Sequence, residues 1–166
     1  MIPYKTHGLV AAAILSMSGT PLAWAQQKVE EAGIDSMMAD HRIFELEKDH
    51  LVILVHERGI ETTADPSMPT NMTAIDCMGM VDVLPDKTSK GNGYCVLTDS
   101  EGDKIFQRWS SSSAMPENRY ETIGGTGKFE GAKGEGTAKV TELAPGPQGR
   151  SVVQWKGSTE YPNLRK

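Results

Sequence analysis

Residues 122–137 read T-I-G-G-T-G-K-F-E-G-A-K-G-E-G-T, and glycine fills six of these sixteen positions. A phosphate-binding P-loop requires G-x-x-x-x-G-K-[S/T], because its backbone amides surround the phosphates while the lysine and a hydroxyl reach the outer phosphate and the metal. Here Phe129 follows Gly127-Lys128, so the hydroxyl is missing, and the preceding glycines are too near for that spacing. The stretch therefore favours a tight corner between two strands over a nucleotide site.

The segments on both sides of this corner indicate an all-β fold. Short β-branched and aromatic runs alternate with Gly, Pro, Asp and Asn clusters at intervals of about ten residues, which is typical of a sandwich or barrel. Hairpin connections between neighbours favour an up-and-down antiparallel sheet, and closing it into a barrel removes the exposed edges. We expect an eight-stranded antiparallel β-barrel with strands near 41–47, 51–62, 72–83, 93–98, 104–111, 119–123, 135–143 and 151–161.

The N-terminus has the pattern of a secretory signal peptide. Lys5 precedes an apolar run of small residues at 8–19, and Ala23-Trp24-Ala25 supplies an A-x-A cleavage site. The apolar run is too short for a membrane-spanning helix, which needs about 20 residues. We therefore expect a signal peptide at 1–25, a flexible polar leader at 26–40 and one barrel domain at 41–166, exported to the bacterial periplasm or beyond the cell.

The glycine-rich stretch resembles the G-G-T-G-K-F signature of the dirigent proteins, and more loosely the matching region of the allene oxide cyclases. The segment 93–103 is also similar to one in bacterial exported proteins. The resemblance implies a calycin-related eight-stranded barrel, in which dirigent proteins steer the coupling of phenoxy radicals and allene oxide cyclases close a ring, both without a metal or organic cofactor. Glycines that let backbone turn and pack closely at a barrel corner fit this fold, and Phe129 is placed to plug the barrel end. The corner glycines are Gly124, Gly125, Gly127, Gly131 and Gly134.

The two cysteines, Cys77 and Cys95, fall on consecutive expected strands. A hairpin centred on Asp86 puts them directly opposite one another, and an exported protein folds in an oxidising compartment. We therefore predict a structural cross-strand disulfide.

We expect no metal site, although two patterns offer alternatives. Methionines gather at positions 68, 72, 78 and 80, and thioether ligands with nearby histidines would suit exported Cu(I). Met is also a common core filler, and no regular Met or His array is present. Acidic residues crowd the turn at 99–103, but Gly102 interrupts the order that a calcium loop requires.

Polar and aromatic side chains on the expected strands are the candidates for a ligand pocket, because such groups fix the orientation of a ligand in an apolar cavity. No G-x-S-x-G motif supports a serine hydrolase. The candidates are His56, Asp76, Tyr94, Arg108, Trp109, Tyr120 and Trp155.

The charge pattern narrows the class of partner. The formal net charge is -5 with acidic and basic residues interspersed, so no basic patch suggests nucleic acid or an anionic membrane. We expect a barrel that binds a small, largely apolar molecule without a cofactor. The alternatives are a cofactor-independent cyclase or isomerase, in which Asp76 or His56 would move protons, and a copper-binding or purely structural exported protein.

Overall fold

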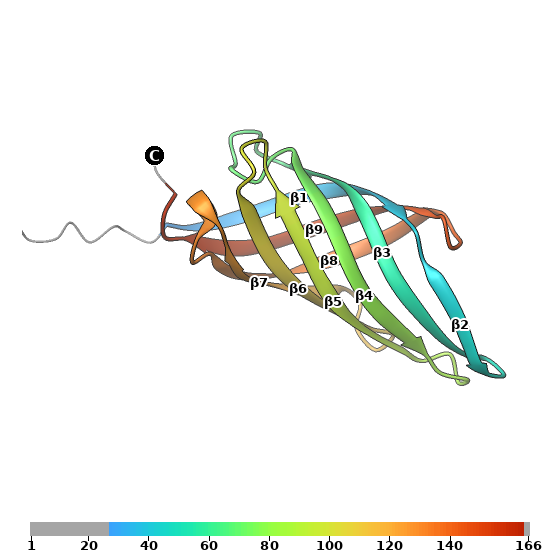
Figure 1. The fold of residues 1–166 in the computed structure, drawn as a ribbon. Coiled ribbons are helices and arrows are strands. Elements are labelled where there is room, and N and C mark those ends of the chain that lie inside the picture. Colours follow the sequence, from blue (N-terminus) through green and yellow to red (C-terminus); the bar gives the residue numbers. More distant parts are fainter. Residues whose placement is uncertain (1–26, 165–166) are drawn as a thin grey trace, which may run out of the picture.

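The computed structural model describes residues 27–164, and the expected signal peptide at 1–25 lies outside this range. Nine strands and one short turn of 3-10 helix, η1, make up the fold (Figure 1). No helix of the described residues is long and apolar enough to cross a membrane. The elements are β1 (Gln27–Ala39), β2 (Arg42–Glu47), β3 (His50–Thr63), β4 (Thr73–Val83), β5 (Ser89–Thr98), β6 (Lys104–Ser112), β7 (Asn118–Gly125), η1 (Gly127–Phe129), β8 (Lys133–Ala144) and β9 (Arg150–Tyr161).

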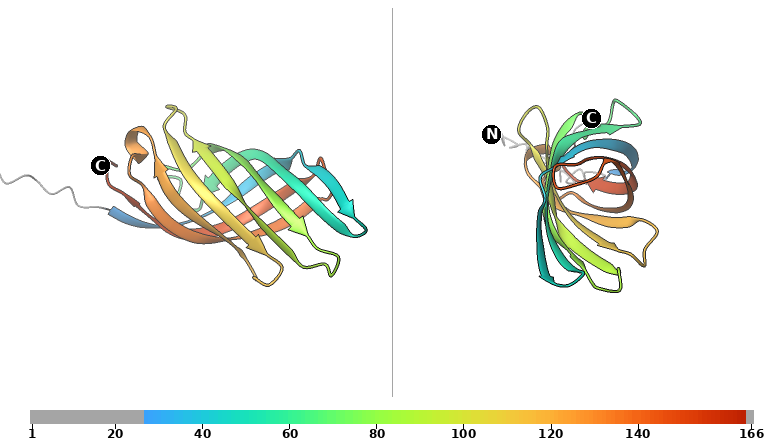
Figure 2. Two further views of the ribbon diagram at one scale, coloured as in Figure 1. Left: turned by 60° about the horizontal axis from the view of Figure 1, so that its bottom comes forward. Right: turned by 90° about the vertical axis from the view of Figure 1, so that its right-hand side faces the viewer.

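All strand pairs are antiparallel, and eight of the nine strands close into a ring. The order is β1-β9-β8-β7-β6-β5-β4-β3, and the pairing of β1 with β3 completes the circle. The strands run obliquely around the barrel, and the ring is visible when the molecule is viewed along its length (Figure 2). The predicted all-β, eight-stranded antiparallel barrel is therefore confirmed.

The first strand of the ring differs from the sequence-based expectation. Residues 26–40 were expected to form a flexible leader outside the barrel, but residues 27–39 form β1, which pairs with β9 along nearly its whole length. The segment 41–47, which was expected to open the barrel, corresponds to β2. That strand pairs only with the first part of β3, beyond the point where β1 takes over as the neighbour of β3. β2 is thus an exposed continuation of β1, outside the ring.

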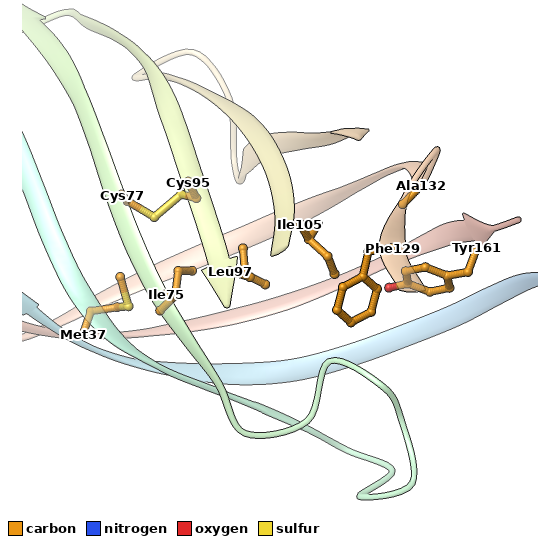
Figure 3. Packing of buried hydrophobic residues seen from close by; sticks show 9 residues of the cluster. All are labelled: Met37, Ile75, Cys77, Cys95, Leu97, Ile105, Phe129, Ala132 and Tyr161. Carbon is orange, nitrogen blue, oxygen red and sulfur yellow. A yellow bond between two sulfur atoms is a disulfide. The ribbon is translucent and has the colours of Figure 1, made fainter. Parts of the chain in front are cut away.

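The glycine-rich stretch forms the corner between β7 and β8. Gly127 has φ 54° and Gly131 has φ 78°, in the left-handed region that favours glycine. Between them η1 directs Phe129 into the barrel, where it packs against Tyr161 with 5.9 Å between ring centroids. Figure 3 shows these two rings side by side at one end of the buried cluster. Phe129, Ala132 and Tyr161 are almost fully buried, so they fill this end of the barrel, which we call the closed end.

The predicted disulfide is confirmed. Cys77 on β4 and Cys95 on β5 are direct neighbours in the ladder and are joined by a disulfide bond inside the barrel. The bond indicates a non-reducing environment for the folded protein.

Replacing both cysteines by alanine is expected to lower the free energy of unfolding by about 3 kcal/mol, because the bond closes a loop between residues 18 positions apart. Denaturant titration of the double variant C77A/C95A under non-reducing conditions measures the loss. Reduction of the wild-type protein should give a similar decrease, and a change below about 1 kcal/mol in both experiments would contradict the estimate.

Candidate functional site

Successive residues of a strand point to opposite faces of a sheet, so every second residue of each strand enters the barrel. These inward residues surround a cavity of about 320 Å³, which we call the lumen cavity. Its wall is mostly apolar and aromatic, with several acidic, amide and basic groups. Val140 lines the cavity and is also 43% exposed, so the cavity reaches solvent at the end opposite Phe129. Its lining includes Asp35, Met37, Glu61, Trp109, Tyr120, Ala138, Val140 and Trp155.

The large inward side chains lie against glycines of neighbouring strands. The ring of Trp155 covers Gly33, and a Cβ at that glycine would lie 2.6 Å from the indole. Trp109 covers Gly79 and Gly93 in the same way, with 2.4 Å and 2.7 Å to the ring. Because these glycines have no Cβ, the aromatic rings pack directly against the backbone of the neighbouring strands. This close packing leaves space in the lumen, where the cavity lies.

The side chain of Tyr120 also lies against glycines, here on two neighbouring strands. Its phenol end lies over Gly136 of β8 and Gly157 of β9, where added Cβ atoms would come within 2.4 Å and 2.3 Å of the hydroxyl. The ring meets Trp155 edge-on at 6.3 Å between centroids. Tyr120 and Trp155 therefore form one aromatic corner of the lumen cavity.

Three carboxyl groups are buried inside the barrel. Asp35 on β1 and Glu61 on β3 are direct partners in the ladder and are 6% and 4% exposed. Side chains opposite one another on one face lie about 5 Å apart, so these two acidic groups are neighbours in the cavity wall. The indole nitrogen of Trp155 donates a hydrogen bond of 2.9 Å to Asp35. Glu31 lies nearer the closed end and accepts hydrogen bonds of 3.0 Å from the Tyr161 hydroxyl.

Burial raises the pKa of all three carboxyls, because the charged form loses its hydration. Desolvation raises the pKa of Asp35 to about 7 and that of Glu31 to about 7, against smaller opposing effects of their hydrogen bonds. The pKa of Glu61 is raised well above its ordinary value by desolvation and then by the charges of Asp35 and Glu31. Near neutral pH this group of acids therefore holds protons that an exposed carboxylate would have lost.

The seven candidate ligand residues divide between the two faces of the barrel. Trp109, Tyr120 and Trp155 line the lumen cavity. The other four point outward, where His56 contacts Asp76 at 3.2 Å, the Arg108 Nε donates to Glu121 at 2.7 Å, and Tyr94 is 62% exposed. The structure thus joins three aromatic candidates into one site and leaves the four outward residues apart from it.

The acidic residues of the site were not among the sequence-based candidates. Asp35 and Glu31 fall in the segment expected to be a leader, and Glu61 lies near the end of an expected strand. One signal was available: Val29, Glu31, Gly33, Asp35 and Met37 share a face at a period of two residues.

The methionines considered as copper ligands lie on both faces of the barrel. Met72, Met78 and Met80 are exposed on the outside of the fold, whereas Met37 is buried inside the barrel. At the 98–104 hairpin the Lys128 Nζ contacts Asp99 at 2.6 Å and Glu101 at 2.9 Å, so a lysine pairs with two of the three acidic residues of the turn.

No family model and no curated protein matches the sequence. Solved structures do share the fold. The pterocarpan synthase dirigent protein GePTS1 superposes with a TM-score of 0.52 at 12% identity, covering 86% of this chain and 90% of that chain. The pterocarpan synthase dirigent protein PsPTS1 gives 0.51 at 12% identity, covering 84% of this chain and 97% of that chain. At this identity the likeness is one of fold, and the chain has the eight-stranded antiparallel barrel of the dirigent proteins.

Proposed function

We propose that this protein is exported and binds a small, largely apolar molecule in the lumen cavity. The observation that carries the proposal is the cavity itself, about 320 Å³ of space held open by aromatic rings that lie on glycines. Pockets for small ligands have this character, with an apolar lining and a few well-placed polar groups. Trp109, Tyr120 and Trp155 supply the aromatic surface. The disulfide supports an oxidising location such as the periplasm.

The substitution Ala138→Phe tests this proposal, because Ala138 lines the cavity and pairs with Trp155 in the ladder. A phenyl group there occupies the ligand space. We expect compounds that raise the melting temperature of the wild-type protein in a screen of phenols and fatty-acid derivatives to lose that effect in A138F.

The matched control is Ala74→Phe, which adds the same ring to the exposed outer face of β4. A74F should respond to ligands as the wild type does. If no compound shifts the wild type and native mass spectrometry finds no co-purified molecule, the binding proposal fails and a purely structural role takes its place.

A second function, cofactor-independent proton transfer during a cyclisation or isomerisation, is favoured by the carboxyl pair. Asp35 and Glu61 line the cavity, and a pKa of about 7 suits Asp35 to give and take protons near neutral pH, while burial also raises the pKa of Glu61. The barrel shared with dirigent proteins supports this alternative at the level of fold only. Mass analysis of a bound compound before and after incubation tests it. Conversion by the wild type that disappears in D35N supports an enzyme, and an unchanged compound supports a carrier.

A further inference from the structure

The lumen cavity brings two buried carboxyl groups and aromatic side chains together without an ion-pair partner for either carboxyl. Asp35 and Glu61 face the cavity from adjacent strands, and Trp109, Tyr120 and Trp155 line the same cavity. Among the described residues, two basic side chains line the cavity. Arg119 is exposed and forms no ion pair with either carboxylate, and His41 lies 3.4 Å from Glu57. The acidic pair is therefore uncompensated.

Among the buried acids, Glu61 has the fewest polar partners. The residue is 4% exposed, and no ion pair among the described residues reaches it. The Thr70 hydroxyl lies beside Glu61 and favours its ionised form, but a neutral hydroxyl supplies no positive charge to balance a carboxylate. Buried carboxylates are rare in proteins unless they are paired, because the charge loses its hydration without compensation. The free side of Glu61 faces the cavity, where a ligand can supply the missing partner.

We propose that the ligand of the lumen cavity is an organic cation, an apolar body that carries a protonated amine. This inference rests on the proposed binding function and names the class of its ligand. An ammonium group placed between Asp35 and Glu61 donates hydrogen bonds to both carboxylates and neutralises them. The faces of Trp155, Trp109 and Tyr120 attract the same charge through their π-electrons, as aromatic cages do for alkylammonium ligands. The apolar wall receives the hydrocarbon part.

Binding of a cation should also release protons from the site. Burial keeps protons on the Asp35 and Glu61 carboxyls near neutral pH, whereas a nearby ammonium group favours their ionised forms. Several other titratable or charged groups face or border the acidic pair. They are Glu31 on β1, His41 at the cavity rim, Glu57 on β3, Arg119 and Tyr120 on β7, Glu142 on β8 and Tyr161 on β9.

Three probes with one aromatic body test the inference: 2-(1-naphthyl)ethylamine as the cation, 2-(1-naphthyl)ethanol as the neutral form and 1-naphthylacetate as the anion. Titration calorimetry at pH 7 should show the cation binding at least about tenfold more tightly than the alcohol, and no binding of the anion. Titrations in two buffers of different ionisation enthalpy should reveal proton release for the cation alone.

Variants then separate the cation inference from the binding function. Glu61→Gln and Asp35→Asn keep the side-chain shape, and each should weaken cation binding about 10- to 100-fold while changing the alcohol less than about threefold. Glu30→Gln makes the same charge change on the outward, exposed side of β1 and should change the affinity for neither the cation nor the alcohol. Alcohol bound as tightly as the cation, or E61Q without effect on the cation, would overturn the inference and leave the binding function intact. If none of the three probes binds the wild type, the cation inference fails, and the compound screen with native mass spectrometry decides the binding function.

Discussion

Raising the pH from 5 to 8 should destabilise the barrel by several kcal/mol, with most of the loss between pH 5 and pH 7. The pKa of Asp35 and that of Glu31 are each about 7 in the folded protein, whereas an unfolded chain gives values near 4. The folded state therefore binds protons that the unfolded state releases. Stability from this source is complete below the unfolded pKa and disappears as the pH rises through the folded pKa. Each pKa unit corresponds to about 1.4 kcal/mol.

Two adjacent substitutions on β1 isolate this effect. Glu31→Gln removes one of the buried titrating groups, and the amide oxygen can still accept the hydrogen bond from Tyr161. We expect E31Q to raise the free energy of unfolding at pH 8 by about 2 kcal/mol and to change it little at pH 5. Glu30→Gln lies one residue away on the exposed outer face and should leave the pH profile unchanged.

Guanidinium titrations followed by tryptophan fluorescence at pH 5, 6, 7 and 8 measure both variants and the wild type. A wild-type stability that is flat or rises over this range would show that the inner carboxyls are ionised in the folded barrel. That result would also remove the physical basis for proton release on ligand binding.

The strands, their antiparallel order and the disulfide could be predicted from the sequence because local signals determine them. Turn residues separate the strands, and the hairpin centred on Asp86 sets Cys77 opposite Cys95, as the ladder between β4 and β5 confirms. The first barrel strand could not be found in this way. β1 has an inverted pattern, in which Glu31 and Asp35 point inward and Ile34 and Met38 are exposed. A prediction that places only apolar residues inside the barrel fails on β1, because this strand carries the buried carboxyl groups of the site.

The inner and outer faces were also ambiguous on several strands. The run 51–55 is apolar at every position, so its alternation cannot identify the buried face. The disulfide offers a reference that resolves the ambiguity on two strands. Cys77 and Cys95 point into the barrel, so their neighbours Asp76 and Tyr94 must point out. Asp35 and Glu61 become neighbours only when β1 pairs with β3 and closes the ring, and no local sequence pattern indicates that pairing.

Truncating the plug of the closed end, Phe129→Ala, should cost about 3 to 5 kcal/mol of unfolding free energy. Phe129 is fully buried and packs against Tyr161, and the tight corner around η1 leaves neighbouring backbone little freedom to fill the space. The matched control is Phe44→Ala on β2, where the ring is 49% exposed and the expected loss is below about 1.5 kcal/mol. Denaturant titrations at pH 5, where the inner carboxyls hold their protons, keep the comparison free of the charge effect. Equal losses in F129A and F44A would mean that the closed end does not depend on its plug, and that the glycine corner supports the barrel through its backbone alone.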